Sequence, residues 1–516
     1  MSRGQFELQS KHCQITAMVY PDFSRFKALA AAGNFIPVYR ELVADLETPV
    51  SAWYRVCAGQ PYSFLLESVE GGERLGRYSF LGCDPLWVLQ ARGDRTRQTH
   101  RNGSVTEYKG DPFNILADCL APLKPVHLPE LPASIAGLVG YWGYDLMRWI
   151  EPTVPVFEPE PDDPPDGLYV QVDSILIFDQ VKRKIWVVAY ANLQDRDLET
   201  AYADACDRVQ ALVDKLTAPL DSAKLYLNWS PPSTTDIPYT ASVSQERFCE
   251  QVVAAKEYIK AGDIFQVVLS QRLTAPFEGD PFTLYRALRL INPSPYMAYL
   301  QLGDMQLIGS SPEVMVKLDR AGDRNIASVR PIAGTRPRGR TQAEDLALGE
   351  ELLVDPKERA EHVMLVDLGR NDLGRVCDRG SVSVDELMSI ERYSHVMHIV
   401  SNVVGTLEPD RTAWDLLKAT FPAGTVSGAP KIRAMQIIHE LEGLRRGPYS
   451  GAYGFYDFTG QLNTAITIRT AIVQQGRVFV QAGAGIVADS EPEKEYQETL
   501  NKARGMLEAI ALAMQA

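Results

Sequence analysis

The chain has 516 residues, of which 45% are hydrophobic and 23% charged, which is the composition of a folded globular protein. At about 150 residues per domain, this length allows roughly three domains. Lys and Arg total 52 against 66 Asp and Glu, so the formal net charge is −14. A negative chain repels nucleic acid and anionic membranes on average, so we expect neither as a partner.

Targeting signals and cysteine spacing point to the cytoplasm. No apolar run reaches the roughly 18 residues of a membrane-spanning helix, and the first 20 residues lack the apolar core of a signal peptide. The seven cysteines are odd in number and widely spaced, which argues against zinc motifs and a disulfide framework. We therefore expect a cytoplasmic protein with reduced thiols.

Strand patterns dominate the first part of the chain. Residues 174–178 and 185–190 are β-rich runs separated by DQVKRK, which predicts a hairpin. Residues 151–167 hold six prolines and six acidic residues, so we expect an irregular, solvated segment there.

A Pro/Ser/Thr-rich stretch at 228–240 reads as a linker. We therefore divide the chain at this stretch. The predicted parts are an extension at 1–30, an N-terminal domain at 31–220, a linker at 221–240 and a second domain at 241–516.

Helices and strands mix after the linker. Apolar residues at helical spacing predict a helix over 245–261 that ends at Gly262. Residues 264–272 alternate as a strand with Gln266 and Ser270 on one face. An Asp-Pro pair at 355–356 predicts the start of a helix that runs to about Leu368.

The C-terminal segment continues this mixture. Strands are predicted near 464–470 and 478–482, and the capping-box pattern at 490–493 precedes a C-terminal helix. Sheets and helices that do not alternate regularly predict an α+β fold.

Two predicted helices carry glutamates three residues apart, Glu358 with Glu361 and Glu495 with Glu498. Residues at this spacing share a helix face, so opposed faces would gather four carboxylates around one point, a site that suits Mg²⁺. Glutamate also commonly faces solvent, and Glu498 can pair with Lys502 along the helix. Spacing alone favours the solvated alternative.

Several other polar positions also allow more than one interpretation when each is considered alone. Thr425 lies between two glycines that allow backbone N–H groups to face an anion, and Arg469 projects from an apolar strand. His398 can act as a base or remain structural. The GAGIVA segment at 483–488 imitates a dinucleotide fingerprint, but too few residues follow it for that fold.

In their order along the chain, however, these segments resemble the chorismate-utilising enzymes. Two further segments, LLES at 65–68 and NPSPYM at 292–297, resemble the anthranilate synthase component I branch of that family. The segments after the linker are GDIFQVVLSQR (262–272), SSPE (310–313), RPIAGT (330–335), ERAEHVMLVDLGRNDLGRV (358–376), HVMH (395–398), FPAGTVSGAPK (421–431), YSGAYG (449–454), IRTA (468–471), QAGAGIV (481–487) and EYQETLNKA (495–503).

The resemblance implies a fold of mixed β-sandwich sheets flanked by helices, arranged as two intertwined subdomains. It assigns regulation to the domain at 31–220 and chorismate binding and catalysis to the domain at 241–516. It matches nothing in the first 30 residues or so.

Two positions select the branch. Relatives that add water to chorismate carry a lysine where this chain has Gln266, and a glutamine cannot deprotonate water. The aminodeoxychorismate synthases typically have a lysine nucleophile where this chain has Ala333, and alanine cannot form a covalent adduct. Both positions favour anthranilate synthase, which makes anthranilate and pyruvate from chorismate and ammonia.

The resemblance also implies a metal and an acid–base pair. Glu361 and Glu498 would hold Mg²⁺ with Glu358 and Glu495 as supports, and the ion would bind the ring carboxylate. Glu313 is the expected general acid for the departing C4 hydroxyl. His398 would assist the later elimination of pyruvate.

The expected substrate cradle uses the remaining motif residues. Arg469 and Tyr449 would hold the enolpyruvyl carboxylate of chorismate. The other expected contacts are Gly334, Thr335, Thr425, Gly483, Ala484 and Gly485.

Partners follow from the same resemblance. The chain has no G-x-C-x-G elbow for a glutaminase nucleophile, so ammonia is expected from a separate glutamine amidotransferase subunit, component II. L-Tryptophan is expected as a feedback inhibitor bound at Ser68 and at Pro295, Tyr296 and Met297. The alternatives are component I of aminodeoxychorismate synthase and a non-catalytic, tryptophan-binding regulatory subunit.

Overall fold

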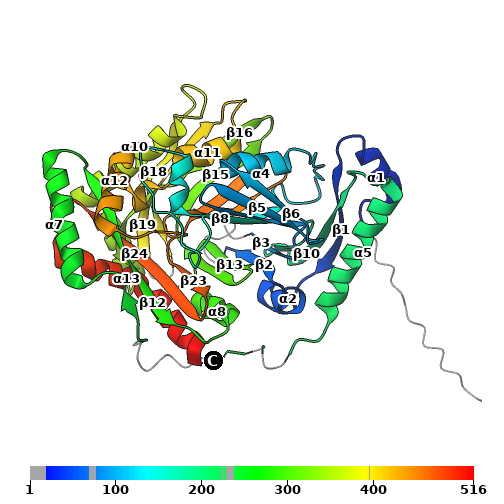
Figure 1. The fold of residues 1–516 in the computed structure, drawn as a ribbon, viewed down its shortest axis with the longest axis horizontal. Coiled ribbons are helices and arrows are strands. Elements are labelled where there is room, and N and C mark those ends of the chain that lie inside the picture. The colour runs from blue at the N-terminus through cyan, green and yellow to red at the C-terminus, as the bar shows by residue number, and fades with distance from the viewer. Residues whose placement is uncertain are drawn as a thin grey trace, which may run out of the picture.

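Two large antiparallel sheets organise the protein, as the computed structural model in Figure 1 shows. The structure describes residues 19–68, 77–221, 224, 226–227, 237–393 and 396–515. Within these ranges each sheet has 12 strands.

The first sheet has a strand order that departs from the order in the chain. Across it run β1 (Phe35–Val43), β10 (Lys184–Asn192), β9 (Ser174–Asp179), β3 (Tyr78–Cys83), β2 (Tyr62–Glu67), β13 (Tyr296–Leu302), β14 (Met305–Ser311), β23 (Thr470–Gln474), β24 (Arg477–Ile486), β12 (Gln266–Pro276) and β11 (Thr240–Ala241), with β20 (Gly428–Ala429) beside β12.

The second sheet is built in the same way. Across it run β17 (Ile332–Pro337), β19 (Val396–Thr406), β16 (Arg324–Val329), β15 (Val314–Ala321), β22 (Leu462–Ile466), β21 (Ala452–Tyr456), β7 (Leu138–Trp142), β8 (Gly167–Gln171), β4 (Trp87–Arg92), β5 (Arg95–His100) and β6 (Val105–Lys109), with β18 (Ser383–Arg392) beside β19.

Both sheets draw strands from both sides of the predicted linker. The neighbours β2 and β13 pair in the first sheet, and β7 and β21 pair in the second. A buried core joins the sheets, in which the rings of Phe80 and Phe455 lie 5.3 Å apart. The prediction of an α+β sandwich with intertwined parts is confirmed, and strands from before and after the predicted linker at 221–240 share each sheet.

Helices cover the outer faces of the sandwich. On the first sheet pack α1 (Phe23–Leu29), α2 (Pro49–Val56), α5 (Leu198–Thr217), α7 (Gln245–Ala261), α8 (Pro281–Ile291), α12 (Lys431–Glu442) and α13 (Pro492–Gln515). With the second sheet are α4 (Pro112–Leu120), α9 (Gln342–Val354), α10 (Pro356–Leu373), α11 (Ala413–Thr420) and the short turns η1 (Tyr144–Trp149) and η2 (Gly424–Val426).

Local sequence signals explain several of these elements. The predicted hairpin is β9 paired with β10, and α7 ends at Gly262, whose φ of +85° suits glycine. Asp355 caps α10 by accepting the N–H groups of Lys357 and Glu358. This helix continues to Leu373 because its last turns are also buried.

One predicted strand is wrong in an informative way. The sequence predicts a single strand over 464–470, but β22 ends at Ile466 in the second sheet and β23 begins at Thr470 in the first. The residues between them carry the chain from one sheet to the other, and Arg469 adopts a φ of +47° there. Arg469 therefore lies at a crossover between the sheets.

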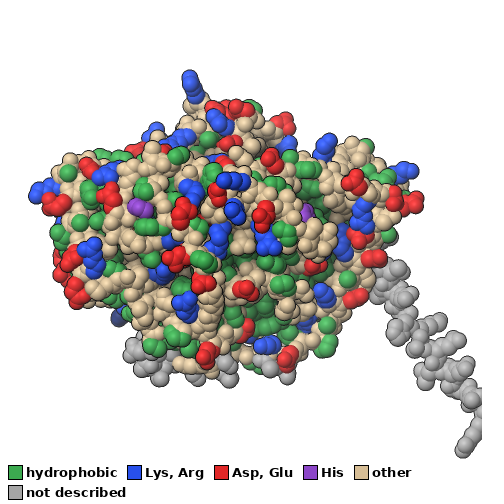
Figure 2. All heavy atoms as spheres, viewed as in Figure 1, with side chains coloured by type: hydrophobic (Ala, Val, Ile, Leu, Met, Phe, Trp, Pro, Cys, Tyr) green, Lys and Arg blue, Asp and Glu red, His purple; other side chains and the backbone are tan. Residues whose placement is uncertain are grey.

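The surface and helices agree with the composition. Acidic and basic side chains are interspersed over the face in Figure 2. Among the described residues, we find no helix that combines the length and apolar character needed to span a membrane.

Candidate active site

Two acidic helix faces approach each other although more than one hundred residues separate them in the sequence. Burial raises the pKa of Glu361 on α10, and the nearby charges of Glu358 and Glu498 raise it further. On α13, burial and then the charge of Glu498 raise the pKa of Glu495. The structure therefore brings the two predicted pairs within electrostatic reach of each other.

Lys502 is the cation bound directly to Glu498 in this cluster. The Lys502 Nζ is 2.8 Å from the Glu498 carboxylate and donates to the Gly483 carbonyl oxygen at 3.0 Å. Its charge also opposes the raised pKa values of Glu361 and Glu495. The sequence analysis treated Lys502 only as a helix-surface partner of Glu498, so its contact with β24 was missed.

The donor chemistry fits a hard divalent ion. Across the described ranges, no three or more His, Cys, Asp or Glu side chains are already arranged as a metal site. The carboxylates nevertheless repel one another: the charges of Lys502 and Lys357 oppose the raised pKa of Glu361 without cancelling it, and Arg336 pairs with Glu358 at 3.5 Å. Carboxylate oxygens in such excess are the ligands Mg²⁺ takes in proteins, and the ion would relieve the repulsion.

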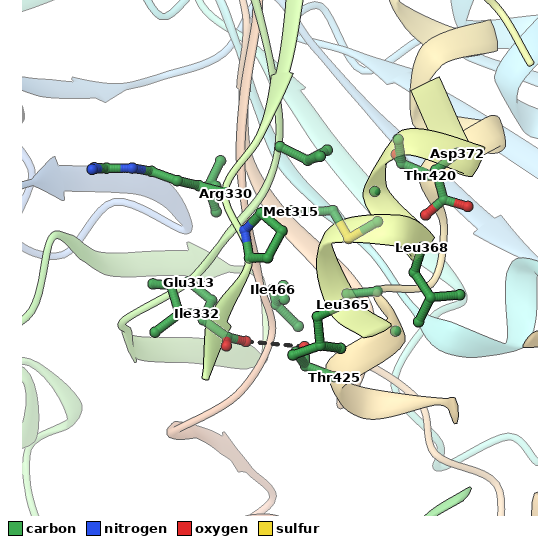
Figure 3. Close-up of a pocket in the computed structure, with 16 residues that line it drawn as sticks. Glu313, Met315, Arg330, Ile332, Leu365, Leu368, Asp372, Thr420, Thr425 and Ile466 are labelled. Carbon is green, nitrogen blue, oxygen red and sulfur yellow. Dashed lines mark hydrogen bonds between the residues drawn. The ribbon is translucent and has the colours of Figure 1, made fainter. Parts of the chain in front are cut away.

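Glu313 lies between β14 and β15 at the edge of a cavity of about 50 Å³. Its Oε2 accepts a hydrogen bond from the Thr425 hydroxyl at 3.1 Å, shown dashed in Figure 3. Burial raises the pKa of Glu313, whereas the Thr425 hydroxyl and the charge of Arg469 oppose that rise. A carboxyl group that holds its proton more tightly than usual suits a general acid.

The walls of this cavity are mostly apolar. Ile332, Leu365 and Ile466 line it, while the guanidinium of Arg330 points away from the other labelled residues in Figure 3. Arg330 instead pairs with Glu391 and Glu386. Arg330 therefore has carboxylate partners of its own and is not left free for a ligand in the cavity.

His398 is buried on β19 beside a bulge in β17. Its Nδ1 lies 3.0 Å from the Gly334 carbonyl oxygen and 3.1 Å from the Thr335 hydroxyl. A carbonyl only accepts, so Nδ1 carries the proton and Nε2 keeps a free lone pair. Burial lowers the pKa of His398, which leaves the ring neutral and able to act as a base near pH 7.

Gly334 is required at the bulge. Its φ is +66°, and a Cβ there would lie 3.0 Å from Leu352 Cδ1 and 3.2 Å from Glu358 Oε2. The register of β17 against β19 slips between Ala333 and Thr335, so the bulge places Gly334 between His398 and Glu358.

Arg469 connects the acid and base sides of the site. Its carbonyl oxygen accepts the Ser310 N–H at 3.0 Å, and its charge acts on both Glu313 and His398. Burial lowers the pKa of Arg469, yet a guanidinium remains charged. The site thus offers a fixed positive charge to an anion.

Two buried oxygens at this site have no protein partner among the described residues. They are Thr467 Oγ1, two residues before Arg469, and Gln266 Oε1 at the start of β12. Gln266 fits there because Gly485 has no side chain; a Cβ at Gly485 would lie 3.0 Å from Gln266 Nε2. Unpaired buried oxygens are costly, so a polar group that reached them would be favoured.

Tyr449 lies against β24 in the same manner. A Cβ on Gly483 would lie 2.7 Å from the Tyr449 hydroxyl, so glycine lets this phenol approach the strand. Burial raises the pKa of Tyr449 to about 12, which keeps the hydroxyl a neutral donor. The methyl of Ala484 between the two glycines instead packs in the core with Leu269.

Sequence reasoning missed the ion pair that supports Tyr449. The guanidinium of Arg446 pairs with Glu442 at 2.6 Å and lies 5.5 Å from the centre of the Tyr449 ring. Both charged side chains are almost fully buried. The sequence signal for this ion pair was Arg446 itself, which comes three residues after Gly443, the glycine that ends α12.

The residues predicted to bind L-tryptophan lie together at the end of β2. Met297 pairs with Glu67 across β13 and β2, which places Ser68 beside Tyr296. Met297 is buried, and Pro295 is buried next to it, while the Tyr296 carbonyl accepts the Tyr453 hydroxyl at 2.7 Å.

Glu67 adds a feature that sequence reasoning missed. Its buried carboxylate accepts from the Tyr285 hydroxyl and lies 3.2 Å from Arg289 Nε. Both partners are on α8, so this helix is tied to the end of β2. The sequence signal for this ion pair was an acidic residue directly after the apolar Leu65 and Leu66 in LLES.

Comparisons with known proteins agree with this geometry. The profile described as chorismate binding enzyme matches residues 62–508. Anthranilate synthase component 1 of Synechocystis sp. is 67% identical, with 96% of this chain and 99% of the relative covered. The protein of the same name from Acetivibrio thermocellus is 48% identical over 96% of this chain and 99% of its own length.

Solved structures give the same picture. Anthranilate synthase component I of Streptococcus pneumoniae has a TM-score of 0.74 and 38% identity, with 90% of this chain and 99% of that chain covered. The menaquinone-specific isochorismate synthase of Escherichia coli, at 19% identity and a TM-score of 0.65, shares the fold over 94% of this chain and 98% of its own. The chain therefore belongs to the chorismate-binding enzyme family and, within it, to the anthranilate synthase component 1 group. It is an enzyme that acts on chorismate.

The hydrogen bond from Thr425 to Glu313 gives a test of the acid. Replacing Thr425 by Val removes a donor that favours the charged carboxylate, so the pKa of Glu313 should rise further. A general acid works only when protonated, so activity falls as pH rises through this pKa. The basic limb of the kcat–pH profile should therefore move to higher pH, and kcat should fall by less than about 100-fold because Glu313 remains.

Thr420→Val is the matched control. Thr420 lines the same cavity, but its hydroxyl bonds to the carbonyls of Leu416 and Leu417 in its own helix. The control should leave the basic limb in place. A Thr425→Val profile that coincides with the unmodified one would remove Glu313 from the acid role.

Proposed function

We propose that this chain converts chorismate and ammonia to anthranilate and pyruvate, the first committed step of L-tryptophan biosynthesis, with Mg²⁺ as its cofactor. The observation that carries the proposal is that the carboxylates of α10 and α13 act on one another, that the charge of Glu361 acts on Glu313, and that Arg469 acts on both Glu313 and His398. One end of this site suits a metal-bound carboxylate and the other suits a free one, which matches a dianion.

The chain's own residues would divide the work between binding and proton transfer. Glu361 and Glu498, with Glu358 and Glu495 behind them, would hold Mg²⁺, which supplies positive charge for the ring carboxylate. Arg469 and the neutral hydroxyl of Tyr449 would orient the enolpyruvyl carboxylate. Gly334, Thr335 and the strand backbone at Gly483 and Gly485 would close around the ring.

Proton transfer would use the two groups whose pKa values are shifted, Glu313 and His398. Glu313, whose pKa is raised by burial, would deliver a proton to the departing C4 hydroxyl as ammonia attacks C2. His398, neutral with its Nδ1 held by the Gly334 carbonyl, would take up a proton during the loss of pyruvate. Glutamine at position 266 supports attack by ammonia, because it cannot deprotonate water.

Anthranilate is fluorescent, so the reaction can be followed directly. The purified chain with chorismate, an ammonium salt and Mg²⁺ should generate fluorescence, and EDTA should abolish it. Glu361→Gln or Glu498→Gln should reduce this turnover by at least about 100-fold, because each removes a proposed ligand. Thermal stability should hold or rise in Glu361→Gln, since burial and like charges disfavour its carboxylate.

Glu493→Gln is the matched control, because Glu493 is an exposed residue in the first turn of the same helix as Glu498. It should retain full activity. Product that keeps the pyruvyl group would indicate an aminodeoxychorismate synthase, and unchanged turnover in both ligand variants would exclude the proposed metal site.

The proposed ammonia source is a separate glutamine amidotransferase subunit. This chain alone should therefore use ammonium salts but not glutamine, and anthranilate production from glutamine should require the added subunit. The ratio of the two rates at equal chorismate measures this. Glutamine-dependent product from the purified chain alone would contradict the assignment.

L-Tryptophan is proposed to bind at Ser68, Pro295, Tyr296 and Met297. Ser68→Ala should raise the inhibitor concentration needed for half-inhibition by about 10- to 100-fold, the value of one hydrogen bond to a charged group. Ser104→Ala, in an exposed turn between β5 and β6, is the control and should leave inhibition unchanged. Inhibition that survives both Ser68→Ala and Met297→Leu would place the inhibitor elsewhere.

A further inference from the structure

Two cysteines far from the active-site residues lie together under a surface cavity. Cys57 follows α2 and is fully buried, and Cys83 ends β3 and is half-buried. Their thiols are in hydrogen-bonding contact, and the Cys83 Sγ also donates to the Val56 carbonyl oxygen at 3.4 Å. The active-site chemistry uses neither thiol.

The cavity gives Cys83 access, and its lining carries three basic residues and one acidic residue, Asp84. It has a volume of about 130 Å³ and is lined by Cys83 with Val56, Leu212, Arg101, Arg208 and Lys215. A space of this size admits a small molecule of a few heavy atoms.

The three cations differ in their pairing. Arg101 pairs with Asp173 at 2.8 Å and with Asp84 at 3.4 Å, and Arg208 pairs with Asp173 at 3.2 Å and with Asp204 at 3.1 Å. Lys215 pairs with no carboxylate in the part of the chain that the structure describes, and its charge acts on both cysteines. Lys215 is thus the cation available to a thiolate.

Cys83 differs from the other described cysteines. The hydrogen bond from Cys57 and the charge of Lys215 lower the pKa of Cys83. Burial raises the pKa of the remaining described thiols, Cys57, Cys119, Cys206, Cys249 and Cys377. A partly exposed thiol close to a cation such as Lys215 is the kind that reacts.

We propose that Cys83 and Cys57 form a redox modification site, in which a small peroxide enters the cavity and oxidises the pair to a disulfide. The Cys83 thiolate attacks one peroxide oxygen and the O–O bond breaks, giving a sulfenic acid and a hydroxide that takes a proton to become water. The Cys57 sulfur then attacks the Cys83 sulfur, and the displaced hydroxide leaves as water with the Cys57 proton. Two thiols lose two electrons in total, and one peroxide becomes two waters.

The disulfide would tie the end of α2 to β3. The ring of Trp53 on α2 stacks on Phe282 of α8 at 3.6 Å, and β3 pairs with β2, which ends beside Ser68. Oxidation would therefore act on α2 and β3 and, through the Trp53–Phe282 contact, on α8.

Peptide mapping by mass spectrometry after hydrogen peroxide treatment tests the proposal on the full-length chain. Free thiols are alkylated first, and the digest is kept non-reducing. The expected result is a linked peptide pair containing Cys57 and Cys83 that has lost the mass of two hydrogens and is restored by a reductant. A map in which Cys206 or Cys249 is oxidised before Cys83, or in which Cys83 joins another cysteine, overturns the proposal.

Two variants assign the order of the steps. In Cys57→Ser, a dimedone adduct should accumulate on Cys83, whereas in Cys83→Ser the buried Cys57 should stay reduced. Cys206→Ser is the matched control and should form the same disulfide as the unmodified chain. Equal oxidation of Cys57 in Cys83→Ser would contradict Cys83 as the attacking thiol, and the map of the unmodified chain decides the matter if a variant fails to fold.

Discussion

The buried pair of Arg446 and Glu442 is the interaction on which the active-site geometry depends. Arg446 donates to the carbonyls of Val268 on β12 and Val426 in η2, and to the Ser450 hydroxyl. Glu442 accepts the N–H of Ser270 at 2.7 Å. One ion pair thereby fixes β12, the turn that carries Thr425 and the loop that carries Tyr449, and breaking such a pair costs about 3–5 kcal/mol because it leaves a buried charge alone.

The crossover between the sheets provides the second constraint. Residues 467–469 leave one sheet and enter the other, and the Thr467 N–H and carbonyl are held by Gly451 and Ser450. A regular strand would alternate its side chains above and below one sheet. The break instead places Arg469 where its charge reaches both Glu313 and His398.

Local sequence patterns predicted the helices and strands well, whereas features that depend on contacts between distant segments were missed. The hairpin of β9 and β10, the helix ended by Gly262 and the helix capped by Asp355 follow from signals within a few residues. The break after Ile466 does not, because its cause is a neighbouring strand in another sheet. The role of Arg446 was likewise hidden, since the carbonyls of Val268 and Val426 that it binds come from two distant segments that only folding brings to it.

The link between the proposed tryptophan site and the acidic helices also depends on tertiary contacts rather than on local sequence. Glu67 is bound by Tyr285 and Arg289 of α8, and the C-terminal end of α8 meets α13, where a Cβ on Gly505 would lie 3.8 Å from Asn292 Cβ. Helix α13 carries Glu495 and Glu498. A ligand beside Ser68 that shifts Glu67 must therefore work against α8 and α13, and linkage requires that occupancy of the acidic site oppose that ligand equally.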